Sequence, residues 1–517
     1  MKKTTVPFPI IDVFAGPGGL GEGFATAEGD RGQRRFNSVL SIEKNEFAQR
    51  TLLLRHFLLN FPKNEIPDAY YDYLQERITL EDLYREYEPE FKKALKSAKR
   101  LSLGPQTHAI VRDLIESRLA GRKRWVLVGG PPCQAYSLVG RSRMMGDPEF
   151  EADERHFLYR EYLKIIIDHR PPVFVMENVK GLLSAKMNGS PIINRIVEDL
   201  SRPKEALGEK TNGLAYRLHS LTESERPLGD VDPRLFLVKA EEYGVPQARH
   251  RMFIVGVRDD LDITPKQLRR STGPTVEQTI GNLPPIRSGL TRSDDTATNW
   301  NKEIGVLSKV DLLPQLDGSL FAETVAEAIQ ETLKKMNPPA ERASRKYPKG
   351  SPSDHTALQW MHDPRLNVLT GHESKAHMAS DLRRYLFAAV FARETGRSPL
   401  LVDFPQMLLP EHANVELGRA GRMFADRFRV QMANQVATTI TSHISKDGNY
   451  FIHYDPMQCR SLTVREAARL QTFPDNYKFE GSKTEQYHQV GNAVPPFLAA
   501  QIAEIIGDVL DAVKNEE

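Results

Sequence analysis

Apolar residues in this chain fall into short runs separated by turn-forming residues. Runs of strand length occupy 10–14, 38–42, 125–128, 173–176 and 252–257. Between some of these runs, as over 107–120 and 157–168, apolar residues recur every three or four positions, which predicts helices. Strands that alternate with helices predict an α/β fold built on an open sheet.

Two stretches depart from this alternation. Residues from about 60 to 124 are rich in charge and helical in pattern, and we interpret them as a helical insertion that decorates the sheet. Residues from about 259 to 435 lose the strand and helix rhythm and are rich in proline, glycine, serine and threonine. This shift predicts a second, mostly irregular domain. The first domain then comprises residues 1–258, and residues 436–517 rejoin it.

The last segment carries clear helix signals. Thr463 stands at an N-cap position, and Glu466 follows three residues later, where it can complete a capping box. A final helix is expected after Pro495-Pro496, with Leu498 and Ile502 on its apolar side.

Composition narrows the class of protein only slightly. The chain has 517 residues, and its 70 Lys and Arg residues nearly balance its 68 Asp and Glu residues, so net charge neither demands nor excludes nucleic acid. It has only two cysteines, Cys133 and Cys459, which excludes a disulfide framework or a cysteine-rich zinc cluster and favours a reducing cytosol. We find no run of about 18 apolar residues. We therefore expect a cytoplasmic protein without a membrane span or a bound metal.

Cys133 follows the strand-length run 125–128 directly after Gly129-Gly130-Pro131-Pro132. This turn ends the strand, and ligands in open α/β sheets bind outside the carboxyl ends of the strands. A lone cysteine is more often a buried structural residue. Two rigid prolines before it favour instead a nucleophile whose side chain is held in one direction.

A glycine-rich turn follows the first strand. Gly16, Gly18 and Gly21 match the spacing of a dinucleotide-binding fingerprint, a weak signal alone, and such turns let the backbone approach a ligand closely. The second strand ends at Glu43, about 20 residues further on, where a carboxylate can accept hydrogen bonds from a ribose diol. A solvated glutamate at a strand end is the alternative.

Two further strands carry chemically useful side chains at their ends. Glu177 follows the run 173–176, so consecutive strand and helix units each place a reactive group after a strand. Arg249 and Arg251 lie two residues apart at the start of another strand and therefore face the same side, where they suit an anion or a ring carbonyl. For both features, a solvated surface position is the alternative.

Taken together, these residues resemble the carbon-5 cytosine-specific DNA methyltransferase family. The matching segments, in chain order, are Asp12-Val13-Phe14-Ala15-Gly16-Pro17-Gly18-Gly19, Gly130-Pro131-Pro132-Cys133-Gln134, Glu177-Asn178-Val179, Gln247-x-Arg249-x-Arg251, Arg460-x-Leu462-Thr463-x-Arg465-Glu466 and Gly491-Asn492-x-Val494. The resemblance implies a Rossmann-like, S-adenosylmethionine-dependent domain and an inserted target-recognition domain.

The resemblance also assigns roles. Carbon 5 of cytosine is a poor nucleophile, so the Cys133 thiolate is expected to add to carbon 6 first. Glu177, with a raised pKa, would neutralise charge on ring nitrogen 3, and Arg249 and Arg251 would hold the carbonyl side. Because the target lies inside a duplex, it must be flipped out.

Cofactor contacts are implied for a set of residues around the sheet edge. They are Phe14, Gly16, Gly18, Gly19, Glu43, Asp113, Leu158, Asn492 and Val494. In this family an acidic residue usually holds the adenine ring, and the helical insertion makes its position in this sequence hard to identify. Asp113 is our candidate for it.

The expected partner is double-stranded DNA, for a monomeric bacterial enzyme that works beside a cognate restriction nuclease or other defence-system proteins. Basic clusters such as Arg345, Lys346 and Lys349 can bind phosphates, although solubility explains them equally. Three alternatives remain. They are a nicotinamide dehydrogenase with the same glycine turn, a transfer-RNA cytosine-5 methyltransferase, and a non-catalytic DNA-binding relative.

Overall fold

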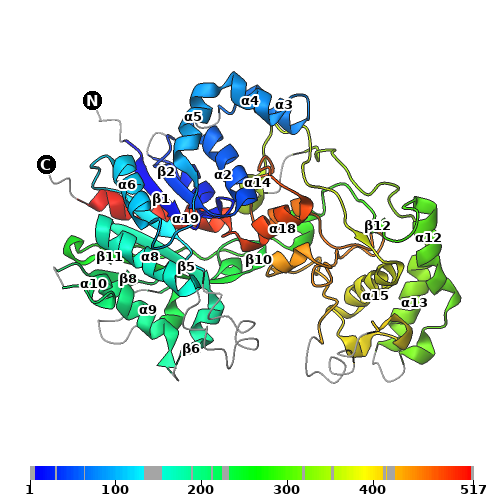
Figure 1. Cartoon of the computed structure of the whole chain (residues 1–517). Helices are drawn as coiled ribbons and strands as arrows, with labels where there is room; N and C mark the ends of the chain where they lie inside the picture. Colours follow the sequence, from blue (N-terminus) through cyan, green and yellow to red (C-terminus); the bar gives the residue numbers. More distant parts are fainter. Residues whose placement is uncertain are drawn as a thin grey trace. The chain divides into compact units, whose positions relative to one another are not determined.

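The computed structural model describes residues 6–29, 32–62, 65–132, 154–187, 190–210, 213–223, 232–316, 321–350, 354–411, 415 and 425–513. The chain divides into two compact units (Figure 1). The first comprises Met1–Gly244, Arg249–Thr272 and Ala493–Glu517, and the second comprises Val245–Ala248 and Gly273–Asn492.

The first unit is built on one eight-stranded sheet. Its strands are β1 (Phe8–Val13), β2 (Phe36–Glu43), β3 (Ala98–Arg100), β4 (Val126–Gly129), β5 (Val173–Val179), β8 (Tyr216–His219), β9 (Leu237–Lys239) and β11 (His250–Arg258). They lie in the order β3-β2-β1-β4-β5-β11-β8, with β9 paired to β11. Strands β1 to β5 are mutually parallel and β11 is antiparallel to its neighbours. This order is that of a Rossmann-like, doubly wound sheet, as the family resemblance implied.

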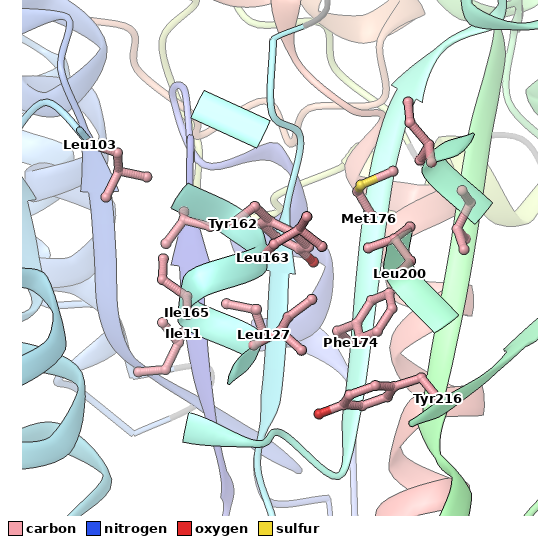
Figure 2. Packing of buried hydrophobic residues seen from close by; sticks show 14 of the residues in the cluster. Ile11, Leu103, Leu127, Tyr162, Leu163, Ile165, Phe174, Met176, Leu200 and Tyr216 are labelled. Carbon is pink, nitrogen blue, oxygen red and sulfur yellow. The ribbon is translucent and has the colours of Figure 1, made fainter. Parts of the chain in front are cut away.

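Helices cover both faces of this sheet, which explains why its central strands are apolar throughout. The helices of the unit are α1 (Gly19–Thr26), α2 (Glu46–Leu59), α3 (Asp68–Leu74), α4 (Leu80–Glu86), α5 (Glu88–Ser97), α6 (His108–Leu119), α8 (Glu154–His169), α9 (Ile192–Ser201), α10 (Pro203–Ala206) and α19 (Pro496–Ala512). On one face, Ile11, Leu127 and Phe174 pack against residues of α8 such as Tyr162 (Figure 2). The core therefore fixes the positions at which the strands end.

Helices α1 and α19 pack closely, which joins the two ends of the chain. A side chain at Gly23 would collide with the Pro496 carbonyl and with Ala499, at 2.5 and 2.4 Å. Glycine is required here because the backbones of the two helices approach each other. The final helix therefore packs in the first unit.

The segment expected to be an insertion is partly integral to the sheet. Strand β3 pairs in parallel with β2, and α6 packs its buried residues Val111 and Ile115 into the main core. Only α3, α4 and α5 are additional to the alternating pattern. The three residues of β3 are too few, and Lys99 and Arg100 too polar, to be recognised as a strand from sequence.

The second unit contains more helix than its composition indicated. Its helices are α11 (Val276–Ile280), α12 (Ala297–Gly305), α13 (Ala322–Lys334), α14 (Thr356–Met361), α15 (Ala379–Thr395), α17 (Val464–Leu470) and α18 (Lys483–Asn492), with short strand pairs β10 (Gln247–Ala248) with β14 (Ala437–Thr438) and β12 (Gly289–Leu290) with β13 (Ala376–His377). Helices α12 and α13 pack against α15 around Trp300, Leu382 and Phe387.

The boundary between the units also differs from the expected one. Residues 436–492 pack within the second unit rather than with the sheet. Gln247 belongs to the second unit as well, because its side chain donates to the Leu470 carbonyl and accepts from the Ile440 amide. The motif Gln247-x-Arg249-x-Arg251 is therefore divided between two units.

The expected capping box at Thr463 is present and forms part of a buried charged cluster. Thr463 accepts from the Glu466 amide, and Glu466 accepts from the Thr463 amide. Both carboxylate oxygens of Glu466 also accept from Arg460, at 2.7 Å each. These bonds lower the pKa of Glu466 far below its usual value despite burial.

Within the described residues, Lys483–Ala512 is long and apolar enough to cross a membrane by length and composition. However, 72% of its most apolar window is buried inside the protein, as in a core helix.

Candidate active site

The candidate site lies at the carboxyl ends of β1, β2, β4 and β5, all in the first unit. The chain runs outward from β1 to β2 on one side and from β4 to β5 on the other. In open α/β sheets, ligands bind outside the carboxyl ends of the strands at such a reversal, which lies here between β1 and β4. Among the described residues, the glycine turn after β1, Glu43 at the end of β2 and Glu177 near the end of β5 lie at this edge.

The turn after β1 has a strained backbone. Phe14 has φ 59°, a left-handed conformation that costs a non-glycine residue about 1–3 kcal/mol and is concentrated at functional sites. Gly16 and Gly18 also have positive φ, at 57° and 100°. A side chain at Gly19 would lie 2.3 Å from the Val494 carbonyl oxygen, so Val494 of the last segment lies against this turn. The first turn of α1 thus presents its backbone amides beside the sheet edge.

Glu43 connects this turn to the end of β2. One carboxylate oxygen accepts from the Gly16 amide at 2.8 Å, and the other accepts from the Asn45 amide at 2.7 Å. The carboxylate is half-buried and held in one orientation. A carboxylate oxygen has more than one lone pair, so Glu43 keeps the capacity to accept from a ligand hydroxyl.

Asp12 is a buried acid of the first motif that received no role from the sequence. Its side chain is fully buried below the turn, and its carboxyl lies 3.4 Å from the point where a side chain of Gly21 would begin. Neither carboxyl oxygen has a hydrogen-bond partner among the described residues. Burial, and to a smaller extent Glu43, raise the pKa of Asp12 well above its usual value. The signal that could have found it was an acid inside an otherwise apolar strand.

The segment after β4 is held by β5. The Asn178 side chain donates to the Pro131 carbonyl at 3.2 Å and accepts from the Val179 amide at 2.8 Å. A side chain at Gly130 would lie 2.7 Å from a carboxylate oxygen of Glu177. Glycine therefore lets the β4 turn approach this carboxylate directly.

Glu177 and the two arginines form one buried cluster. Arg251 lies with its Nε 3.1 Å from Glu177 Oε1, because β11 runs antiparallel beside β5 and pairs Phe253 with Glu177. Burial raises the pKa of Glu177 above its usual value, although Arg251 and Arg249 favour its charged form. Arg249 is almost fully buried, and burial together with the neighbouring Arg251 lowers its pKa. The result is a carboxyl that takes up a proton more readily than an exposed one.

The structure places the remaining predicted residues as follows. Cys133 lies outside the described residues, one position after Pro132. Leu158 is half-buried in α8 and packs against the main core. Asn492 is the exposed last residue of α18, in the second unit.

Asp113 does not join the cluster at the strand ends. It lies in the middle of α6, where its side chain is 68% exposed and pairs with Arg112 at 3.2 Å. The loop that follows β3 begins beside Glu43, where the Leu101 amide donates to the Glu43 carbonyl. This loop, Leu101-Ser102-Leu103-Gly104, contains no acid.

Comparisons with known proteins agree with this fold. The model of the C-5 cytosine-specific DNA methylase family matches residues 86–508, so the chain belongs to that family. It is thus a DNA (cytosine-5-)-methyltransferase that uses S-adenosylmethionine. The nicotinamide dehydrogenase and transfer-RNA methyltransferase alternatives are not favoured.

Several relatives are similar over nearly their whole length. The chain is 29% identical to Type II methyltransferase M.Bpa9945I of Bacillus paralicheniformis, over 97% of this chain and 99% of that one. It is 26% identical to Type II methyltransferase M.AgeI of Thalassovita gelatinovora, over 96% and 98% of the two chains. A crystal structure of a putative DNA modification methyltransferase from an Escherichia coli prophage shares the fold, with a TM-score of 0.50 and 20% identity over 98% and 99% of the chains.

The described residues fit this cofactor. S-adenosylmethionine carries an ammonium group and a sulfonium, and the unpartnered carboxyl of Asp12 lies below the glycine turn where a cation would offset its burial. Glu43 retains acceptor capacity for a ribose hydroxyl. When bound, the cofactor supplies an electrophilic methyl group.

Proposed function

We propose that this methyltransferase modifies a flipped cytosine within a specific sequence of double-stranded DNA, with Cys133 as the nucleophile and Glu177 as the proton donor. The observation that carries the proposal is the buried cluster of Glu177, Arg249 and Arg251 beside the turn that leads to Cys133. A nucleophile, an acid and two cations thus come from three neighbouring strands.

Each group has a chemical task. The thiolate of Cys133 adds to carbon 6 of cytosine, which moves electron density to carbon 5 and negative charge to nitrogen 3. Glu177 donates a proton to nitrogen 3, and its raised pKa keeps a larger fraction of the carboxyl protonated near neutral pH. Arg251 and Arg249 stabilise the charge that develops on the ring carbonyl side. After methyl transfer, water removes the proton from carbon 5 as the bond between carbon 6 and sulfur breaks, and nitrogen 3 returns its proton to Glu177, which leaves 5-methylcytosine and the free thiolate.

Asn178 is a positioning residue in this scheme. It belongs to the same strand as Glu177 and holds the Pro131 carbonyl two residues before the nucleophile. One side chain of β5 therefore holds the turn that leads to Cys133 beside the strand that carries Glu177.

The cofactor is proposed to lie along the turn after β1. Phe14, Gly16, Gly18 and Gly19 present strained backbone and helix amides there, and Val494 closes the turn from the last segment. Glu43 would bind the ribose. Leu158 and Asn492 remain proposed contacts that follow from the family resemblance, whereas the exposed position of Asp113 argues against its assignment to the adenine ring.

The second unit is proposed to recognise the target sequence. Base-edge contacts specify a sequence and phosphate contacts position the protein. Exchanging residues 260–430 for those of a relative should change the site that is methylated and leave the chemistry intact.

Removing the charge of Arg345, Lys346 and Lys349 should weaken binding to all DNA alike. The slope of log affinity against log salt should fall by about one for each phosphate that the variant no longer neutralises. A changed recognition sequence after these three substitutions would contradict this proposal.

The biological setting is proposed from the relatives, two of which are named Type II methyltransferases. We propose a cytoplasmic monomer that works in a restriction-modification or defence system beside a cognate nuclease.

Bisulfite sequencing of DNA from cells that express the protein tests the function directly. Protection of cytosine at one position of one short sequence is expected, and it should vanish with Cys133→Ser. Absence of protected cytosine, with folded protein present and labelled cofactor bound, would contradict the proposed activity.

A further inference from the structure

A second hollow lies in the first unit, at the edge of the sheet opposite the active site. Its volume is about 730 Å³. It is lined by residues that precede β4, β5 and β8, such as Trp125, Pro172 and Ala215, and by Arg258 at the end of antiparallel β11. All of these residues lie at the amino edge, because β4, β5 and β8 run parallel to one another. Strand β5 separates the hollow from Glu177 by about 15 Å.

Positive charge gathers around this hollow from four elements. The cationic lining residues are Arg112 of α6, Arg122 and Lys123 before β4, Arg170 after α8, and Arg258 of β11. Three acids, Glu116, Asp168 and Asp260, also line it, so cations outnumber acids by five to three.

Several of these charges are already engaged. Arg258 pairs with Asp260 at 2.6 Å, and Asp168 pairs with His108 at 3.0 Å. Among the described residues, Arg122 donates only to the backbone carbonyls of Leu119 and Arg118, and neither Arg122 nor Lys123 has a carboxylate partner. The side of the hollow formed by the turn before β4 therefore carries uncompensated positive charge.

His169 adds a buried polar atom. It is the last residue of α8, and its Nε2 is fully buried without a hydrogen-bond partner among the described residues. Burial lowers the pKa of His169, so its ring is largely neutral at neutral pH and one nitrogen can donate a hydrogen bond. Buried polar atoms are normally paired, and this nitrogen, on a residue that lines the hollow, lacks a partner among the described residues.

We propose that this hollow binds a polyphosphate group. Arg122 and Lys123, which have no carboxylate partner among the described residues, can bind several phosphate oxygens, with the ion-paired Arg112 and Arg258 nearby, and the volume lies in the range of small-ligand sites. The phosphates come either from a free nucleotide or from the DNA backbone outside the methylated sequence. This site is separate from the cofactor crevice and does not depend on the roles proposed for Cys133 and Glu177.

Isothermal titration of the full chain with inorganic tripolyphosphate and with ATP tests the proposal. Saturating S-adenosylhomocysteine is present throughout, so that adenine cannot report on the cofactor crevice. The variant R122E/K123E reverses two exposed charges of the hollow. The matched control R85E/K92E makes the same change on α4 and α5, where both side chains are also exposed. Both variants should retain wild-type methylation rates at saturating DNA, which also shows that they fold.

We expect one site for tripolyphosphate in the wild type, weakened about tenfold or more in R122E/K123E and unchanged in the control. A nucleotide source predicts that ATP binds at the same site and that the affinity for a duplex of A·T pairs alone is unaffected by R122E/K123E. A DNA source predicts that ATP does not bind at this site. It also predicts that R122E/K123E binds the A·T duplex more weakly than the wild type does.

Three results would overturn the proposal. They are no binding of tripolyphosphate to the wild type, equal binding by wild type and R122E/K123E, and equal weakening in both variants, which would indicate a general charge effect.

Discussion

Glu177 and Glu466 are both buried carboxyls with an arginine partner, yet the two units of the molecule treat them in opposite ways. Glu466 has both oxygens bonded to Arg460 and also accepts from a helix amide, and its pKa is strongly lowered. Glu177 pairs with Arg251 through one oxygen, at 3.1 Å, and its pKa is raised. An arginine neighbour alone therefore does not decide whether a buried acid stays charged.

The partners of the charged form make the difference. At Glu466 the attraction of Arg460 and the hydrogen bonds that it donates to both oxygens outweigh burial, and the carboxylate is fixed as a structural ion pair. Where donors are few, burial dominates and the acid takes up a proton more readily. Asp12 follows the same rule, because it has no donor among the described residues and its pKa is raised further. Asp12 and Glu177 at the sheet edge thus have raised pKa values, whereas Glu466 of the second unit is held as a structural ion pair.

The largest expected effect contrasts the two cysteines. Cys133→Ser should abolish methyl transfer, because serine is a much weaker nucleophile than a thiolate at neutral pH. Cys459→Ser should retain the activity, because Cys459 is buried beside Arg460 in the second unit. Initial rates with labelled cofactor provide the measurement. A Cys133 variant that keeps about a tenth of the wild-type rate, a change of only about 1.4 kcal/mol, would exclude covalent catalysis by this residue.

The two glutamates should separate activity from stability. Glu177→Gln should lower kcat about 10²- to 10⁴-fold, because an amide cannot donate the proton, and it should change thermal stability less than Glu466→Gln, because Glu177 pairs with Arg251 through one oxygen only. Glu466→Gln should lower the free energy of unfolding by about 3–5 kcal/mol, because it leaves Arg460 buried without its counter-charge. Denaturant titration and single-turnover rates measure both effects. Equal destabilisation of the two variants would contradict the distinction between a structural Glu466 and a catalytic Glu177.

The same contrast should appear in the dependence on pH. A protonated Glu177 is needed for catalysis, so kcat should fall as pH rises through the raised pKa of Glu177. This fall should be absent from the pH profile of Glu177→Gln. Glu466 has a lowered pKa in the folded state, so its stabilising effect is present above the unfolded value of about 4.5 and is lost as pH falls below it. A wild-type kcat that rises with pH over the titration of Glu177 would speak against the proton-donor role.

A substitution of Asp12 is expected to have the smallest effect on the free energy of unfolding. It should raise this free energy, whereas Glu466→Gln should lower it. Because its folded pKa is raised, the charged form opposes folding once pH exceeds the usual range of the carboxyl. Asp12→Asn should therefore raise the free energy of unfolding at pH 7.5 by about 1–2 kcal/mol and leave it nearly unchanged near pH 4. Binding of S-adenosylmethionine should weaken in the same variant. A lower stability at pH 7.5 would mean that the carboxylate has a stabilising partner in the protein.

Much of this edge could be predicted from sequence because it depends on local signals. Apolar runs followed by glycine and proline located the ends of β1 and β4. Glu177 directly follows another apolar run, and Arg251 directly precedes one. Their contact could not be predicted, because it needs β11 to lie antiparallel beside β5, a pairing between segments about 75 residues apart that only the folded sheet defines.

Other misses have equally specific causes. Strand β3 is three residues long and carries two charges, so it was not recognised and α6 was assigned to an insertion. The acidic residue for the adenine ring was then assigned to Asp113, which lies on the solvated face of α6. The unit boundary was missed at Gln247, because a buried amide that bonds to distant backbone gives no signal in hydrophobic periodicity.

Trapping with 5-fluorocytosine tests the central claim most directly. Fluorine at carbon 5 cannot leave as a proton does, so a duplex that contains 5-fluorocytosine at the target position should remain covalently attached to the enzyme after methyl transfer. Peptide mapping should find the adduct on Cys133, formed much more slowly in Glu177→Gln. An absence of adduct with wild-type enzyme that methylates ordinary DNA, or an adduct on another residue, would contradict the account.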